Sequence, residues 1–174
     1  MKKDVSKIKY IVLDVDGTLT DSGVIYDDNG CESKRFSTKD GVGFNLAHLM
    51  GIKIIVMTGR ESSVTLRRMT ELKTDFIMQN IHNKEEMLKE FMSENNISKE
   101  EIAYVGDDLN DHNSMLLCGY IGCPLDAAVQ IKEIADYVSD KKGGYGAVRD
   151  VIENILALRG DGEEIYSRYY ELSL

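Results

Sequence analysis

The sequence predicts an α/β fold of the doubly wound, Rossmann-like type, built on a mostly parallel sheet. Apolar runs of strand length recur along the chain, and stretches with helical spacing separate them. Several runs, such as residues 11–13 and 54–56, are apolar throughout. Such runs are typical of parallel strands that helices cover on both faces. The 174 residues, 43% of them hydrophobic, suffice for one sizeable core, so we expect residues 1–174 to form a single domain.

The expected strands and helices alternate along the chain. Strands are predicted at residues 10–13, 53–57, 76–78, 102–105, 120–122 and 137–139. Helices are predicted at residues 43–50, 62–72, 84–95, 113–117, 127–134 and 146–158, the last with five aliphatic side chains on one face. A capping-box sequence at residues 98–101 runs directly into a strand, so we expect a single helical turn there.

Two segments depart from this alternation. A β-hairpin is expected over residues 24–36, because two strand-like segments flank Asp27-Asp28-Asn29-Gly30 and Asn-Gly is a strong signal for a two-residue turn. The acidic tail at residues 160–174 contains three tyrosines. We expect it to be either a mobile terminus or a segment that docks on a neighbour.

The composition narrows the functional class. The formal net charge of −9, without a segregated basic face, argues against nucleic acid or an anionic membrane as a partner. There is no run of 18 apolar residues, and the N-terminus does not resemble a signal peptide, so we expect a cytoplasmic protein. The three cysteines lack metal-site spacing, and we interpret them as free thiols in a reducing compartment.

Polar residues follow several predicted strands at their carboxyl ends. Asp14 and Asp16 follow the first strand and can point the same way, because side chains alternate along an extended segment. Thr58-Gly59-Arg60 follows the second strand, Lys84 begins the helix after the third, and Asp107-Asp108 follows the fourth. The carboxyl ends of parallel strands form a ligand-binding crevice. Acids gathered there call for a cation, so we expect a Mg²⁺ site.

This set of groups suits phosphoryl transfer. Asp14 is the candidate nucleophile, and Asp16 is the candidate acid that protonates the leaving oxygen and later activates water. Thr58 and Lys84 are candidates to hold phosphoryl oxygens, and Asp107 is a candidate metal ligand. Asp111 fits either a turn or the site.

These motifs resemble, in order and spacing, the four motifs of the haloacid dehalogenase superfamily. The resemblance covers Asp14-Val15-Asp16-Gly17-Thr18, Thr58, Lys84 and Gly106-Asp107-Asp108. It implies a magnesium-dependent phosphatase in which Asp14 and Asp107 bind the metal through carboxylates and Asp16 through its backbone carbonyl. It also implies that Asp108 and Asp111 support the site. A signalling receiver domain, the rival class, would place its phospho-accepting acid on the third strand.

A narrower resemblance points to the capless branch that contains 3-deoxy-D-manno-octulosonate 8-phosphate phosphatase. It rests on residues 36–41, 58–60, 106–109 and 143–149. It implies a sugar-acid phosphomonoester as substrate, a role in lipopolysaccharide biosynthesis, and homotetramers with sites near subunit interfaces. The implied substrate contacts are Asp16, Ser37, Thr38, Lys39, Asp40, Gly41, Arg60, Arg68 and Lys84. Asn45 stands where that enzyme usually has arginine, so a nine-carbon keto-acid 9-phosphate remains the alternative substrate.

Spacing supports the capless assignment independently. Asp14 and Thr58 are 44 positions apart, and Lys84 and Asp107 are 23 apart. Neither gap can hold a separate cap domain of ordinary size. Exclusion of water and choice of substrate must therefore depend on another element or another subunit. Arg68 interrupts the apolar face of its predicted helix, and it is either a snorkelling side chain or a cation directed at an anionic ligand.

Overall fold

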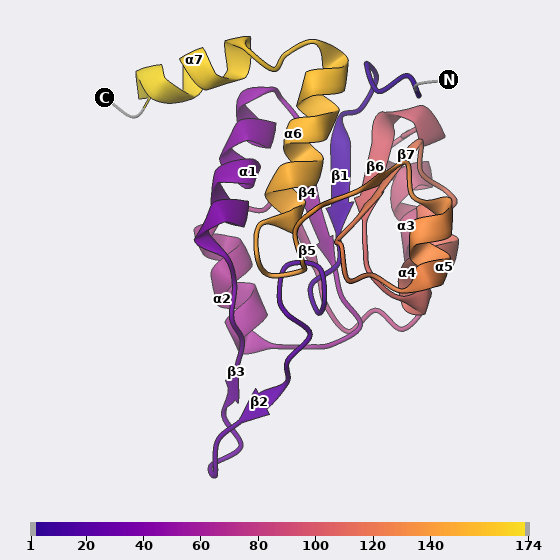
Figure 1. Ribbon diagram of the computed structural model, residues 1–174. Coiled ribbons are helices and arrows are strands. Elements are labelled where there is room, and N and C mark those ends of the chain that lie inside the picture. Colours follow the sequence, from indigo (N-terminus) through magenta and orange to yellow (C-terminus); the bar gives the residue numbers. More distant parts are fainter. Residues whose placement is uncertain (1–2, 173–174) are drawn as a thin grey trace.

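In the computed structural model, which describes residues 3–172, a six-stranded sheet lies between two layers of helices (Figure 1). The strand order is β5-β4-β1-β6-β7-β8, and every pairing is parallel. The strands are β1 (Tyr10–Leu13), β4 (Lys53–Met57), β5 (Phe76–Met78), β6 (Ile102–Val105), β7 (Tyr120–Cys123) and β8 (Tyr137–Val138). The predicted doubly wound parallel sheet is thus confirmed.

Helices cover both faces of the sheet (Figure 1). One face carries α1 (Thr38–Leu49), α2 (Ser63–Glu71), α6 (Ala147–Arg159) and α7 (Glu164–Leu172). The other carries α3 (Lys84–Glu94), α4 (Leu109–Met115) and α5 (Val129–Ile134), with a short 3₁₀ turn at Lys99–Glu101 before β6. Successive side chains of β1 enter opposite cores, Ile11 and Leu13 one and Val12 the other. The apolar strands therefore serve two cores, as their composition predicts.

The position of β1 brings its neighbours' carboxyl ends together. It lies between β4 and β6, with Leu13 level with Val56 on one side and Val105 on the other. The residues that follow these three strands therefore emerge side by side at one edge of the sheet. This edge is where the candidate site residues meet.

Two helices begin earlier than predicted. α1 starts at Thr38 instead of residue 43, because the Ser37 side chain accepts a hydrogen bond from the Lys39 backbone amide and caps the helix. α4 starts at Leu109 instead of residue 113, with Asp108 as its N-cap. The glycine at Gly43 permits close packing of α1 on α6, because a Cβ there would lie 2.9 Å from the Cα of Arg149.

The predicted hairpin is present but has a longer loop than expected. β2 (Ile25–Tyr26) pairs with β3 (Glu32–Ser33), and the hairpin projects from the carboxyl edge of the sheet (Figure 1). Residues 27–31 form the loop, so the predicted two-residue turn is wrong. The Asp27 carboxylate instead accepts hydrogen bonds from the amides of Asn29 and Cys31. Cys31 is exposed, whereas Cys118 and Cys123 are buried, and all three are free thiols as predicted.

The C-terminal tail folds back on its own chain. α7 packs beside α1, Ile165 is buried in the core, and the Tyr166 hydroxyl donates to Glu153 Oε1 at 3.0 Å. The expectation of a mobile tail is therefore wrong for residues 164–172, because an apolar face anchors them, whereas docking on a neighbour stays a prediction. Residues 173–174 of that tail lie outside the described part. Within residues 3–172, no helix is long and apolar enough to cross a membrane.

Candidate active site

A buried ion-pair network lies at the carboxyl edge of the sheet. Lys84 Nζ donates to Asp14 Oδ1 at 2.5 Å and to Asp111 Oδ1 at 2.7 Å. The side chains of all three residues are at most 5% exposed. Tyr104, on β6, adds a hydrogen bond from its hydroxyl to Asp111 Oδ1 at 2.8 Å. Asp111 is therefore part of this network, and its role in a site stays a prediction.

Each member of the network is held by the end of a regular element. Asp14 directly follows β1, and its amide donates to the Val105 carbonyl of β6. Lys84 is the first residue of α3, whose N-cap is Asn83. Asp111 lies in the first turn of α4, and its Oδ2 accepts the Asp107 amide at 3.3 Å. The network therefore joins β1, α3, α4 and the loop after β6.

The carboxylates of Asp14, Asp107 and Asp111 could hold a metal ion, with one ligand oxygen from each lying within 4.8 Å of the others. Burial, and then repulsion by Asp111, raises the pKa of Asp14 well above its ordinary value and that of Asp107 to about 7. The three carboxylates thus carry more negative charge than Lys84 alone neutralises. A hard divalent cation, which prefers oxygen ligands, fits these three carboxylates and would neutralise their excess negative charge.

The loop after β1 is shaped around Asp107. Gly17 has φ +103°, and a Cβ there would lie 2.0 Å from Asp107 Oδ2. Thr18 Oγ1 donates to Asp107 Oδ1 at 3.1 Å. The glycine-rich segment before α6 packs against the same loop, since Gly144 donates its amide to the Thr18 carbonyl at 3.1 Å. The glycine-rich segment before α6 therefore packs against the loop that follows β1 and supports it.

Asp16 and Arg60 lie beside the hairpin. Asp16 Oδ1 accepts a 2.5 Å hydrogen bond from Lys34 Nζ, and Asp16 Oδ2 lies 3.8 Å from Arg60 Nε. The Arg60 guanidinium also donates to Glu32 Oε1 at 2.6 Å and to the Tyr26 hydroxyl at 2.8 Å. The hairpin is thus tied to the groups that follow β1 and β4.

Thr58 occupies the end of β4 as predicted. Its side chain is buried, and its Oγ1 accepts the Arg60 amide at 3.3 Å. The register of β4 on β1 places it beside the loop that carries Asp16. The exposed side chain of Asp108, by contrast, caps α4 by accepting the Leu109 amide. Asp108 therefore orients the helix that carries Asp111.

The remaining predicted substrate contacts are spread along α1 and α2. Thr38 and Lys39 are exposed at the start of α1, and Gly41 is buried behind them. The Arg68 side chain on α2 is 24% exposed and lies 3.4 Å from Glu71 Oε2, with one guanidinium nitrogen close to Gly41. The described contacts do not bring Arg68 into the carboxylate network.

Asp40 lies beneath the surface. Only 1% of it is exposed, and its Oδ1 accepts the Arg149 amide at 3.0 Å, at the first turn of α6. A substrate contact through Asp40 stays a prediction, since Thr58 and Lys84 are buried to a similar degree. Because an acid at a helix N-terminus bonds free amides, Asp40 joins α1 to α6 and to the glycine segment before it.

Replacing Asp40 by Asn is expected to remove a loss of stability that the wild type suffers as the pH rises. Burial raises the Asp40 pKa to about 6, even though the backbone amides of Arg149, Gly146 and Val148 lower it. The folded state therefore takes up a proton more readily than the unfolded state, and stability falls as pH rises from 4 to 6. Asp40→Asn lacks this penalty. The unfolding free energy of the variant minus that of the wild type should therefore be up to about 3 kcal/mol larger at pH 8 than at pH 4. Urea titrations of both proteins at pH 4 and pH 8 measure this change. The same difference between variant and wild type at the two pH values would contradict the prediction.

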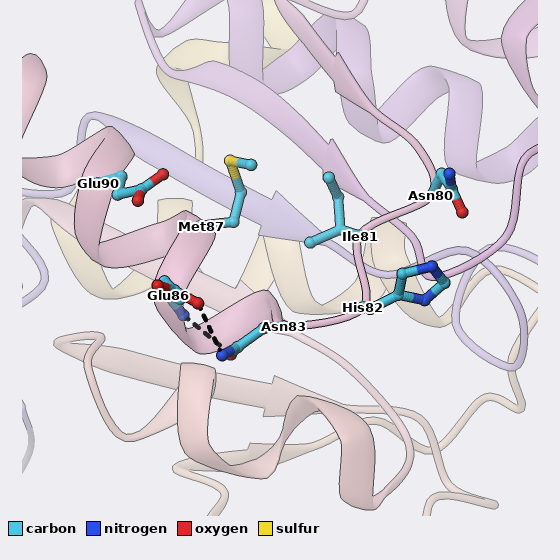
Figure 2. Close-up of a pocket in the computed structure, with 7 residues that line it drawn as sticks. All are labelled: Asn80, Ile81, His82, Asn83, Glu86, Met87 and Glu90. Carbon is cyan, nitrogen blue, oxygen red and sulfur yellow. Dashed lines mark hydrogen bonds between the residues drawn. The ribbon is translucent and has the colours of Figure 1, made fainter.

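A separate pocket of about 290 Å³ lies at the start of α3 (Figure 2). Its lining residues are Asn80, Ile81, His82, Asn83, Glu86, Met87 and Glu90. Figure 2 shows the His82 ring on the side away from Glu86 and Glu90, and Glu86 is engaged by the cap residue Asn83. No member of the carboxylate network lines this pocket, so the candidate chemistry lies outside it.

Sequence reasoning missed three polar residues around the site. Lys34 and Glu32 lie on the hairpin, and Tyr104 lies within an apolar strand. The alternation of Glu32 and Lys34 places both on one face of β3, a signal that could have been read. No local pattern marks Tyr104 as a partner of Asp111.

Comparisons with known proteins agree with this geometry. Residues 74–152 match the haloacid dehalogenase-like hydrolase family model. The chain is 32% identical to 3-deoxy-D-manno-octulosonate 8-phosphate phosphatase of Haemophilus influenzae, over 92% of this chain and 89% of that protein. It is 34% identical to the Escherichia coli K12 enzyme, over 90% and 84%.

Solved structures give the same relationship. One is the Moraxella catarrhalis 3-deoxy-D-manno-octulosonate 8-phosphate phosphatase, crystallised with magnesium, phosphate and the sugar acid. It superimposes with a TM-score of 0.90 and 33% identity over 95% of both chains. The cobalt-bound Haemophilus influenzae phosphatase superimposes with a TM-score of 0.85 and 32% identity over 91% of this chain and 92% of that one. The chain therefore belongs to the haloacid dehalogenase-like hydrolases and, within them, to the family of the 3-deoxy-D-manno-octulosonate 8-phosphate phosphatases.

Proposed function

We propose that this protein is a magnesium-dependent phosphatase that hydrolyses 3-deoxy-D-manno-octulosonate 8-phosphate. One observation carries the proposal: Asp14, Lys84, Asp107 and Asp111 converge at one edge of the sheet. The similarity to phosphatases of this substrate over nine-tenths of the chain supports the substrate. The setting that goes with it is cytoplasmic lipopolysaccharide biosynthesis.

Asp14 acts as the nucleophile. Lys84 fixes its Oδ1, which leaves Oδ2 to attack phosphorus in line with the leaving oxygen. The Oδ2–P bond forms while the bond between phosphorus and the sugar oxygen breaks, and that oxygen takes the proton of Asp16. Water then attacks the aspartyl-phosphate and gives its proton to Asp16, and the Asp14–phosphorus bond breaks. Inorganic phosphate and free Asp14 result, so both groups return to their starting states.

The chain supplies the other roles from neighbouring strand ends. Thr58 Oγ1 and the Lys84 ammonium bind phosphoryl oxygens. The carboxylates of Asp14 and Asp107, together with the Asp16 backbone carbonyl, would hold Mg²⁺, and Asp111 and Asp108 would orient this set. The bound cation supplies positive charge to the phosphoryl oxygens.

Recognition of the sugar acid involves the residues that face the hairpin and the start of α1. Thr38 and Lys39 offer exposed donors there, and Arg60 offers a partly exposed one. Asn45 is exposed on α1 where the octulosonate enzyme usually has arginine. The loss of this cation favours a second candidate substrate, the 9-phosphate of a nine-carbon keto acid.

Assembly is part of the proposal. Val24, Ile25 and Tyr26 are about half exposed on the projecting hairpin. Apolar side chains on such a projection suit burial against other copies of the chain. We expect a homotetramer in which hairpins lie near neighbouring sites. Light scattering of the purified protein tests this, and a fully active monomer would contradict it.

A substrate panel tests the function. Purified protein with Mg²⁺ is assayed for inorganic phosphate release from octulosonate 8-phosphate, a nonulosonate 9-phosphate and common hexose phosphates. We expect the highest kcat/KM for octulosonate 8-phosphate. Higher efficiency on the nine-carbon compound would replace the substrate, and stable phosphorylation without phosphate release would favour a signalling module.

Removal of magnesium is expected to abolish turnover and to lower stability. Because Asp107 has a pKa raised to about 7 by burial, protons compete with the cation below neutral pH. Mg²⁺ at 100 times its Kd should add about 3 kcal/mol to the unfolding free energy at pH 8, and less at pH 6. Thermal melts with EDTA or Mg²⁺ measure both effects. A magnesium shift of equal size in Asp107→Asn would contradict this site.

A further inference from the structure

Lys34 is a buried cation on the return arm of the hairpin that the roles given so far do not use. It directly follows β3, two residues after Glu32, so the two side chains lie on one face of the extended segment. That face is turned toward the site, because Glu32 contacts Arg60 and Lys34 contacts Asp16. The Lys34 side chain is only 1% exposed.

The contact between Lys34 and Asp16 gives the two oxygens of that carboxylate different surroundings. Lys34 Nζ donates to Oδ1 at 2.5 Å. Oδ2 is buried and, among the described residues, has no hydrogen-bond partner, and the same holds for Arg60 Nε, 3.8 Å away. A buried polar atom without a partner calls for a ligand or water. One oxygen of Asp16 is therefore fixed, and the other is left free beside an unused donor.

We propose that Lys34 is a positioning residue for the phosphatase reaction, which fixes Asp16 Oδ1 so that Oδ2 is the oxygen that exchanges the proton with the leaving group. This inference rests on the proposed function. Oδ2 and Arg60 Nε would together receive the sugar oxygen, one as acid and the other as donor. The proton moves from Oδ2 to the sugar oxygen as the phosphorus–oxygen bond breaks.

An ordinary surface ion pair does not explain this arrangement. Exposed Lys–carboxylate pairs keep their ammonium groups in water and contribute little. Burial of a long cationic side chain costs free energy unless it is paired. Lys34 is buried against the one carboxylate that the mechanism uses as an acid, and it comes from a hairpin outside the sheet. Contact between the hairpin and Asp16 would thus place the catalytic carboxyl group in its working position.

The leaving group distinguishes positioning of the acid from other roles. A sugar oxygen needs a proton as it leaves, whereas p-nitrophenolate is stable without one. Asp16 also serves the hydrolysis of the aspartyl-phosphate, which is common to both substrates, so the comparison uses the rate of the first, phosphorylating step in single turnovers. In Lys34→Met we expect this rate to fall about 30- to 100-fold for the sugar-acid phosphate and less than about fivefold for p-nitrophenyl phosphate. KM for both should change less than about threefold. Lys34→Gln, polar and of similar length, serves if the Met variant does not fold, with the same unequal losses.

A double-mutant cycle tests whether Lys34 acts through Asp16. In an Asp16→Asn background, Lys34→Met should lower kcat by less than about threefold. The matched control is Lys89→Met, which removes an exposed lysine that pairs with Glu85 on α3 and should leave kcat unchanged. Equal losses in the phosphorylation rate on both substrates, or a full loss in the Asp16→Asn background, would overturn the proposal. A wild-type protein that releases no phosphate from any sugar phosphate would instead overturn the proposed function.

Discussion

Asp14→Asn is expected to reduce phosphate release by at least about 1,000-fold, the scale on which removal of a nucleophile acts. The amide cannot form the acyl phosphate, although it keeps the shape of the carboxylate. Folding should persist, because Lys84 retains its 2.7 Å contact with Asp111. Burial and repulsion by Asp111 raise the Asp14 pKa, so ionised Asp14 lowers the stability of the metal-free protein. The variant should accordingly melt no lower than the wild type at pH 8.

Steady-state assays of phosphate release, together with thermal melts, measure these two effects separately. Asp140→Asn is the matched control, because the Asp140 side chain is 74% exposed and pairs only with a neighbouring lysine in the described contacts. It should retain full activity. Turnover by Asp14→Asn within tenfold of the wild type would exclude Asp14 as the nucleophile.

Lys84→Met is expected to impair both folding and catalysis. Burial lowers the Lys84 pKa, but attraction by Asp14 and Asp111 outweighs burial, so the net shift is upward and the ammonium is charged. Its removal leaves buried carboxylates without their cation, which costs about 3–5 kcal/mol in similar sites. It also removes a ligand of the phosphoryl oxygens, so we expect kcat/KM to fall at least about 100-fold.

Urea unfolding with and without Mg²⁺ measures the loss of stability. The stabilisation by Mg²⁺ should be larger in Lys84→Met than in the wild type, because the cation then offsets charge that the ammonium no longer offsets. Lys89→Met, an exposed lysine on the same helix, is the control and should unfold like the wild type. A loss below about 1 kcal/mol in Lys84→Met would show that the ion pairs carry little net stability.

The sheet and most of the site could be predicted because local sequence determines them. The strands at Tyr10–Leu13, Lys53–Met57, Phe76–Met78 and Ile102–Val105 match their predicted bounds, since short apolar runs between helical stretches are typical of parallel strands. Asp14 and Asp107 follow such runs directly. Their convergence then follows from parallel pairing on either side of β1.

Both local hydrogen bonds and tertiary contacts decided the features that sequence reasoning missed. The predicted helix begins at residue 43, whereas α1 begins at Thr38 with Ser37 as its cap, and Gly43 lets α6 approach closely. The Asp27 carboxylate organises the hairpin loop in place of a two-residue turn. Lys34 looks like an ordinary hairpin lysine until the hairpin docks on Asp16. Contacts between elements far apart in sequence leave no local pattern, which is why the pairing of Lys34 with Asp16 was missed.

The distribution of the cysteines makes the hairpin accessible to spectroscopy. Cys31, at the hairpin loop, is exposed, whereas burial raises the thiol pKa of Cys118 to about 12 and that of Cys123 to about 11. Because the thiolate is the reactive form, a maleimide dye should label the native enzyme at Cys31 alone. The label would sit next to Glu32, whose contacts with Arg60 and Ser62 fasten the hairpin to the sheet. Fluorescence from a single natural cysteine would then follow hairpin docking during turnover, without an engineered attachment point.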